Sequence, residues 1–91
     1  MKPADLTIGD RISTAIGVLV VSTAPWENFS EDTPQFDRVV VDVEVEDRRR
    51  FGDPVALPGV AGASEFSWLG MTPTLRYRLA FLPGADVEVE R

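Results

Sequence analysis

The stretch VVVDVEVED, from Val39 to Asp47, alternates valine with acidic residues and decides the fold class of this chain. Successive side chains of an extended strand point to opposite faces, so a period of two places the odd-numbered valines on one face. The opposite face carries Val40 and then three acidic side chains: Asp42, Glu44 and Glu46. The pattern predicts a strand from about Phe36 to Glu46, with one buried face and one acidic, solvated face.

Strand-like patterns recur along most of the remaining sequence. Ile, Val and Thr are enriched between Asp10 and Thr23, which indicates two short strands, or one strand bent at Gly17. The run Thr74–Leu82 alternates again. After a tight Pro-Gly-Ala turn, the segment Asp86–Arg91 has the pattern of a last strand that leaves an open sheet edge.

The segments between these runs are less regular. Pro25–Gln35 and Pro58–Ser64 have the composition of loops, and Phe51–Leu57 is a candidate short edge strand because it contains a proline. Phe66–Gly70 is a brief apolar segment that we expect to place Trp68 in the core. No window has helical spacing. We therefore predict a single all-β domain over residues 1–91, a compact antiparallel β-sandwich (Ig-like) or a small β-barrel of about six to seven strands.

The charges on the outer faces predict which strands are neighbours. Glu88 and Glu90 make the last strand acidic like the quoted one, whereas Thr74–Leu82 carries Arg76 and Arg78. Opposite charges across a sheet stabilise it by roughly 0.2–1 kcal/mol per pair, and like charges destabilise it. We therefore expect Thr74–Leu82 to lie between the two acidic strands. The surplus of carboxylates is either a solvated face, or a docking face for a basic partner or a weak cation site.

The composition excludes several reaction chemistries. The chain has no cysteine and no histidine, so it can form neither a disulfide nor a Ser-His-Asp or Cys-His arrangement. Its one lysine, Lys2, lies near the N-terminus, where chains are usually loose. We predict that the protein is not an enzyme and has no cofactor and no metal. An oxygen-ligand metal hydrolase is the enzymatic alternative.

The net charge of −6 argues against nucleic acid as a partner. Asp47 begins the one basic cluster, and the three arginines that follow it are Arg48, Arg49 and Arg50. This cluster is either a contact for an anion or acidic partner, or a solvated turn with local Asp–Arg pairing. No signal peptide is visible in the sequence, and the run Ile16–Val21 is too short to cross a membrane. We expect no membrane partner and a cytoplasmic or virion location.

Two aromatic residues, Trp26 and Phe29, lie in the polar loop WENFSED. They either anchor a partner, since Trp is enriched at interface hot spots, or fold back to cap the end of a small core. The candidate partner-binding residues of the whole sequence are Trp26, Phe29, Asp42, Glu44, Glu46, Arg48, Arg49 and Arg50.

Two families resemble parts of the chain. LTIGDRI (Leu6–Ile12), GVLVVSTAPW (Gly17–Trp26) and RVVVDVEVED (Arg38–Asp47) are similar to the opening of bacterial immunoglobulin-like sandwich domains of the telokin-like type. This resemblance implies an Ig-like sandwich without catalytic residues. YRLAFLPGADVEVE (Tyr77–Glu90) resembles a strand–turn–strand of small β-barrel proteins from tailed-phage head–tail connectors and other virion parts. That resemblance implies a subunit of a larger assembly.

These observations predict a non-enzymatic structural or protein–protein interaction module, for example a subunit of a phage virion. Such a module would bind a protein partner, or associate with itself, through an edge strand. The alternative is a small β-barrel that binds nucleic acid or another ligand through a loop-lined face. For that alternative the sequence offers only Arg48–Arg50 and the adjacent Phe51.

Overall fold

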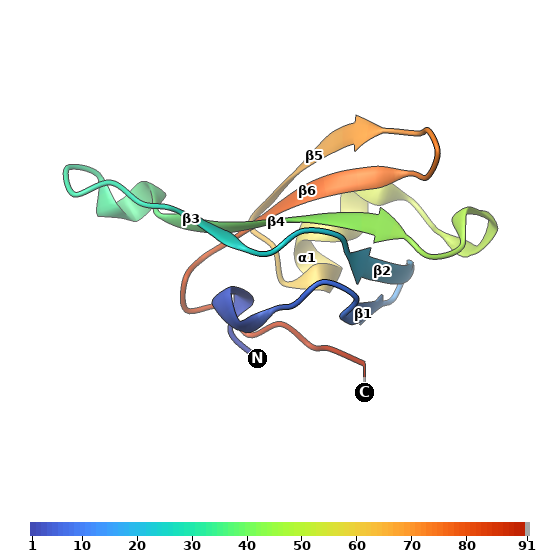
Figure 1. Cartoon of the computed structure of the whole chain (residues 1–91), viewed down its shortest axis with the longest axis horizontal. Coiled ribbons are helices and arrows are strands. Elements are labelled where there is room, and N and C mark those ends of the chain that lie inside the picture. Colours follow the sequence, from blue (N-terminus) through green and yellow to red (C-terminus); the bar gives the residue numbers. More distant parts are fainter. Residues whose placement is uncertain (91) are drawn as a thin grey trace.

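A computed structural model describes residues 1–90, and these contain one antiparallel sheet and one short helix (Figure 1). The strands, with the helix, are β1 (Arg11–Thr14), β2 (Gly17–Val21), β3 (Trp26–Asn28), β4 (Arg38–Val45), α1 (Leu57–Ala61), β5 (Glu65–Gly70) and β6 (Arg76–Phe81). Their order in the sheet is β1-β2-β4-β6-β5, and β3 also pairs with β4. No helix within residues 1–90 is long and apolar enough to cross a membrane.

The core lies on the valine face of β4, as the alternation predicts. Val39, Val41 and Val43 stand opposite Phe81, Leu79 and Tyr77 of β6, and all six side chains are buried. Branched and aromatic side chains in such cross-strand pairs suit a pleated surface. The predicted strands at Phe36–Glu46 and Thr74–Leu82 are therefore confirmed, and so is their adjacency.

Helix α1 and the two terminal segments cover this face of the sheet. Leu57 and Ala61 of α1 join Leu6 and Val87, from the two ends of the chain, in one core cluster. The antiparallel β-sheet prediction is confirmed in its coarser form: the described chain is mostly β, with six strands and one short helix, and the sheet is not closed into a barrel. Among the described residues there is no second sheet of the kind a sandwich needs. Alternation reveals that one face is buried, and it does not reveal what buries it.

The predicted edge strand at Phe51–Leu57 is wrong. Asp53 caps a 3-10 turn, Pro54–Ala56, by accepting a hydrogen bond from Val55 N at 3.0 Å, and this turn continues into α1. Proline suits the first turn of a helix because its missing N–H would have no partner there. Gly62 ends the helix with a φ of 80°. A five-residue helix is too short to produce a visible helical period in the sequence.

The predicted last strand, Asp86–Arg91, is wrong in its described part, and Arg91 lies outside the described residues. Only an isolated bridge forms, between Glu90 and Arg11 of β1. Val87 is buried and its N–H donates to Met1 O at 2.8 Å, so this segment follows β1 and the N-terminus instead of β6. The outer neighbour of β6 is β5, and the placement of β6 between two acidic strands is therefore only half correct.

Strand β3 and the start of β4 form an arm at one end of the molecule. We use "arm" for Trp26–Arg38, which comprises β3, a 3-10 turn at Pro34–Phe36 and the first residue of β4. The sequence predicts a loop at Pro25–Gln35, and β3 lies within it. The molecule extends 42 × 26 × 21 Å. Figure 1 shows the arm at the far left and the 3-10 turn Arg48–Arg50, which we name the arginine corner, beyond the opposite end of β4.

Candidate functional site

At the base of the arm, three side chains contact one another in series on the outer face of the sheet: Asp42, Arg78 and Trp26. Arg78 Nε and Nη2 donate to Asp42 Oδ1 and Oδ2 at 2.8 and 3.2 Å. The Arg78 guanidinium also lies 5.0 Å from the ring centroid of Trp26, a cation–π distance. The predicted charge pairing between β4 and β6 is confirmed for Asp42 and Arg78. Asp42 is therefore paired within the sheet, and Trp26 remains 38% exposed to solvent.

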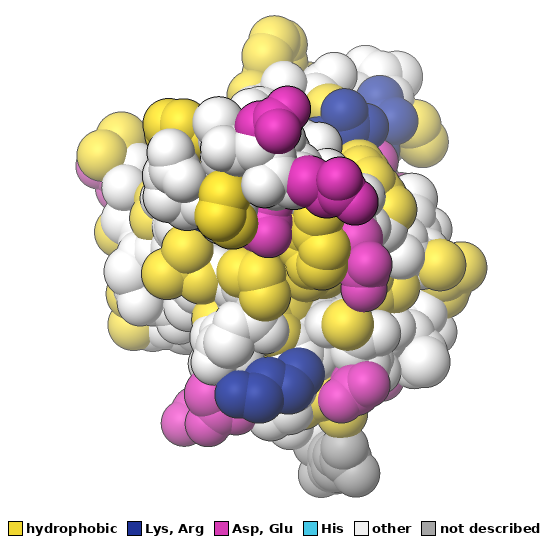
Figure 2. Space-filling view, turned by 90° about the vertical axis from the view of Figure 1, so that its left-hand side faces the viewer, with side chains coloured by type: hydrophobic (Ala, Val, Ile, Leu, Met, Phe, Trp, Pro, Cys, Tyr) yellow, Lys and Arg dark blue, Asp and Glu magenta, His cyan; other side chains and the backbone are white. Residues whose placement is uncertain are grey.

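The tip of the arm combines exposed aromatic rings with unpaired acids. Phe29 is 48% exposed and Phe36 is 65% exposed. Four acidic residues of the arm make no ion pair with any described residue: Glu27, Glu31, Asp32 and Asp37, of which Asp37 accepts a hydrogen bond from Ser30 N at 2.9 Å. Figure 2, which faces this end of the molecule, shows hydrophobic and acidic side chains next to one another. Since Trp26 and Phe29 lie on a projecting arm, they do not cap the core.

The basic residue in the arm is used within the arm and its support. Arg38 Nη1 donates to the backbone oxygens of Asp37 and Gln35 at 2.7 and 3.2 Å. Its Nε donates to Glu65 Oε1 of β5 at 3.2 Å. These bonds hold the base of the arm, and they leave the carboxylates at its tip without a cation.

Glu44 and Arg76 stand opposite each other in the register but form no ion pair within 4.0 Å. The Arg76 guanidinium lies instead over Gly70, where an added Cβ would be 2.8 Å from Arg76 Nη2. A register shift between Trp68 and Gly70 in β5 accompanies this arrangement. The prediction that Arg76 bridges two acidic strands is therefore wrong, because the side chain follows the space that the bulge and the glycine leave.

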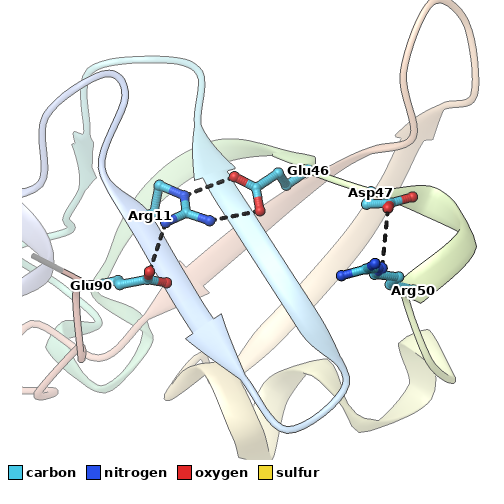
Figure 3. Close-up of polar contacts among 5 residues, drawn as sticks. All are labelled: Arg11, Glu46, Asp47, Arg50 and Glu90. Carbon is cyan, nitrogen blue, oxygen red and sulfur yellow. Dashed lines mark hydrogen bonds and ion pairs between the residues drawn. The ribbon is translucent and has the colours of Figure 1, made fainter.

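Glu46 is part of an ion-pair cluster that holds the C-terminal segment (Figure 3). Arg11 donates to both Glu46 oxygens, Nε to Oε1 at 2.8 Å and Nη2 to Oε2 at 2.7 Å, and Nη1 donates to Glu90 Oε1 at 2.7 Å. The hydrogen bond from Arg11 lowers the pKa of Glu46. A groove of about 420 Å³ runs beside this cluster. The carboxylates of Glu46 and Glu90 in this cluster accept hydrogen bonds from Arg11, so we interpret Glu46 as a structural residue.

The structural role of Arg11 is not visible in the sequence, because Arg11 is the one charged residue in β1 and no alternating charge pattern surrounds it there. The link between Arg11 and Glu90 depends on the C-terminal segment returning to β1, which the alternation of that segment does not reveal.

The arginine corner presents its cations to solvent. Asp47 Oδ1 accepts the backbone N–H of Arg49 at 3.0 Å and caps the turn. Asp47 lies 3.5 and 3.6 Å from Nε of Arg49 and of Arg50, whose side chains are 92% and 87% exposed. Local Asp–Arg pairing is therefore present, but one carboxylate pairs with two arginines, and Arg48 forms no ion pair with a described residue.

Strand β5 is one terminal strand of the sheet, and its outer edge is free among the described residues, whereas β1, at the other end, is bridged to Glu90. The only strand partner of β5 within residues 1–90 is β6. Phe66 and Trp68 stand opposite Leu79 and Tyr77 on the core side, yet Trp68 is 60% exposed because no neighbour covers it. The prediction that Trp68 lies in the core is wrong. The open edge expected at the C-terminal segment is found here instead.

Comparison with known proteins assigns the chain to no family. No protein-family model, no curated protein and no solved structure matches it. Among residues 1–90, no three His, Cys, Asp or Glu side chains gather in an arrangement that could hold a metal ion.

Proposed function

We propose that the protein is a non-enzymatic structural subunit that associates with a second copy of itself through β5. The observation that carries this proposal is the free edge of β5, with the exposed Trp68 beside it. An edge strand presents backbone N–H and C=O groups that can pair with another chain. The sequence of β5, EFSWLG, has one charged residue and neither lysine nor proline, the residues that usually protect such edges.

The side chains of β5 suit an antiparallel pairing with its own copy. In a twofold arrangement centred on Ser67, Phe66 of each copy would stand opposite Trp68 of the other. Aromatic cross-strand pairs of this kind stabilise a sheet, and the two Glu65 side chains would be far apart. Because Glu65 would stand opposite Leu69, which lies at the register shift after Trp68, the shift limits such a pairing to Phe66–Trp68. A short pairing of this type predicts a dimer that dissociates on dilution.

Light scattering behind a sizing column at about 0.5 M salt, where contacts between exposed charged side chains are screened, tests this proposal from low to high micromolar protein. We expect the wild type to dimerise as its concentration rises and Ser67→Lys to stay monomeric, because it places two long side chains of like charge directly opposite each other. Ser13→Lys, the same change at an exposed position of β1, is the matched control and should dimerise like the wild type. A wild type that stays monomeric at every concentration, or a Ser67→Lys dimer, would overturn the proposal.

The setting that we propose for such a subunit is a larger assembly such as a virion. The similarity of Tyr77–Glu90 to strands of small virion proteins supports this setting. A nucleic-acid- or ligand-binding module is the second candidate, and its support is the exposed arginine corner. Titration with single-stranded DNA at low salt separates the two, because a flat response removes the second candidate.

A further inference from the structure

Two surfaces of opposite charge lack partners within the described molecule. The arm carries Glu27, Glu31, Asp32 and Asp37 without ion pairs, and at the arginine corner Asp47 pairs with Arg49 and Arg50, while Arg48 forms no ion pair with a described residue. Most other basic side chains are already engaged. Arg11, Arg38 and Arg78 each hold at least one carboxylate. The arm and the arginine corner are therefore two separate surfaces with unpaired charge of opposite sign. Unpaired acids also lie elsewhere among the described residues, at Asp5, Asp10, Glu44, Asp53 and Glu88, but without the exposed aromatic rings of the arm beside them.

These two surfaces cannot meet within one molecule. The arm continues into β4 at one end, and the arginine corner follows β4 at the other end (Figure 1). They lie toward opposite ends of a molecule that is 42 Å long. Only contact between two molecules could bring the carboxylates of the arm to the guanidinium groups of the corner.

We propose that the tip of the arm of one copy docks on the arginine corner of the next copy. The proposal rests on the inference that the protein assembles with itself, but it uses surfaces other than β5. Guanidinium groups form charge-assisted hydrogen bonds with carboxylates and also stack on aromatic faces. The arm offers both kinds of partner, since Phe29 and Phe36 are exposed beside its acids.

The geometry of this contact differs from that of a twofold dimer. The arm and the corner are different surfaces, so the contact is heterologous and repeats from copy to copy. Such a contact produces a ring if the rotation closes and an open chain if it does not. Pairing through β5 would join two copies about a twofold axis and would stop at a dimer. The arm–corner contact can add further copies, so the number of copies in the assembly separates the two contacts.

A charge-swap experiment tests the contact. The corner variant carries Arg48→Glu, Arg49→Glu and Arg50→Glu, and the arm variant carries Glu27→Lys, Glu31→Lys and Asp32→Lys. Both are made in the Ser67→Lys background, so that pairing through β5 does not contribute. The parent Ser67→Lys protein and an added Glu88→Lys, an exposed acid on the C-terminal segment, are the controls.

Light scattering at low salt should show species larger than a monomer for the parent and for the Glu88→Lys control. Each swap variant alone should be monomeric, because its arm and its corner then carry charge of the same sign. An equimolar mixture of the two variants should assemble again, since each arm then faces a corner of opposite charge. At about 0.5 M salt, where charges are screened beyond a few ångström, the parent assembly should dissolve.

Two results would overturn the proposal. One is a parent that is monomeric at low salt at every concentration while the wild type dimerises, which leaves only the β5 contact. The other is a mixture that stays monomeric although circular dichroism shows both swap variants to be folded. Failure of the β5 proposal has a different signature, which is a wild-type assembly that Ser67→Lys does not change.

Discussion

Arg11 and Glu46 are joined by two parallel hydrogen bonds, 2.8 and 2.7 Å long, between β1 and the residue that follows β4. The same guanidinium binds Glu90, so one arginine holds the first strand, the end of the central strand and the C-terminal segment. A bidentate arginine–carboxylate pair has a fixed geometry that a single contact lacks.

Replacement of Arg11 should loosen the C-terminal segment. In Arg11→Ala we expect a melting temperature a few degrees lower and faster hydrogen exchange at Val87 and Glu90, whose N–H groups bond to Met1 and Arg11. Arg49→Ala, at a fully solvated guanidinium, should leave both readouts unchanged. Equal exchange rates in Arg11→Ala and the wild type would show that Val87 and the backbone bonds suffice to hold the segment.

The stability of the protein should fall in acid. Arg11 lowers the pKa of Glu46, and the N-terminal ammonium lowers the pKa of Asp86 through a contact of 2.6 Å. A lowered carboxyl pKa in the folded state stabilises the fold above the unfolded pKa, and this contribution is lost as the pH falls through the folded value. The loss therefore begins near the ordinary values of 4.5 and 3.8 and continues below them.

Thermal unfolding between about pH 7 and pH 2 measures this dependence, since both ordinary carboxyl pKa values lie in that range. Glu46→Gln should flatten the lower part of the curve, because the glutamine does not titrate. Glu31→Gln, which changes an unpaired acid at the tip of the arm, is the control and should keep the wild-type slope. A Glu46→Gln curve parallel to the wild type at every pH would show that the titration of Glu46 does not contribute to the loss of stability in acid.

Gly17 should not tolerate a side chain. Its φ is 145°, and an added Cβ would lie 2.6 Å from Phe51 Cδ1. We expect Gly17→Ala to reduce the free energy of unfolding by roughly 1–3 kcal/mol, from backbone strain and the displaced ring. Gly59→Ala, where the structure leaves open space, should be neutral or slightly stabilising. Urea denaturation measures both changes, and equal midpoints for the two variants would exclude the close contact with Phe51.

The β4–β6 core should dominate stability. Leu79 is fully buried and stands opposite Val41, so Leu79→Ala should cost about 2–5 kcal/mol. This is a large fraction of the 5–15 kcal/mol typical of a domain, and we expect partial unfolding at room temperature. Leu82→Ala removes an exposed leucine three residues later and should change the free energy of unfolding little. Near-native stability of Leu79→Ala would mean that the core collapses around the lost side chain.

Local alternation predicts the strands of this protein better than it predicts their partners. The patterns at Val39–Val45 and Thr74–Leu82 depend on the period of two, and both strands form. Val87 is buried in the core, as its pattern predicts. The segment that contains it lies beside β1 instead of β6, and this placement depends on packing between residues far apart in the sequence. A five-residue helix at Leu57–Ala61 shows no period at all.

The candidate site was predictable to a similar extent. The sequence singles out Trp26, Phe29 and the arginine run, and the structure places all of them at exposed positions. Solvent exposure of Trp68 was not predictable, because an apolar residue in a strand is buried only where other side chains pack over its face of the sheet. The commitment of Glu46 to Arg11 likewise depends on a contact across 35 residues of sequence.

The position of β4 has a mechanical consequence. This strand connects the arm to the arginine corner and is bonded along one edge to β6 and along the other to β2 and β3. A tensile force applied between the two ends would act along the strand and load its hydrogen bonds together, in shear. Strands loaded in this way resist extension far better than hairpins that unzip one bond at a time. Copies joined end to end through the arm would transmit tension along their stiffest direction.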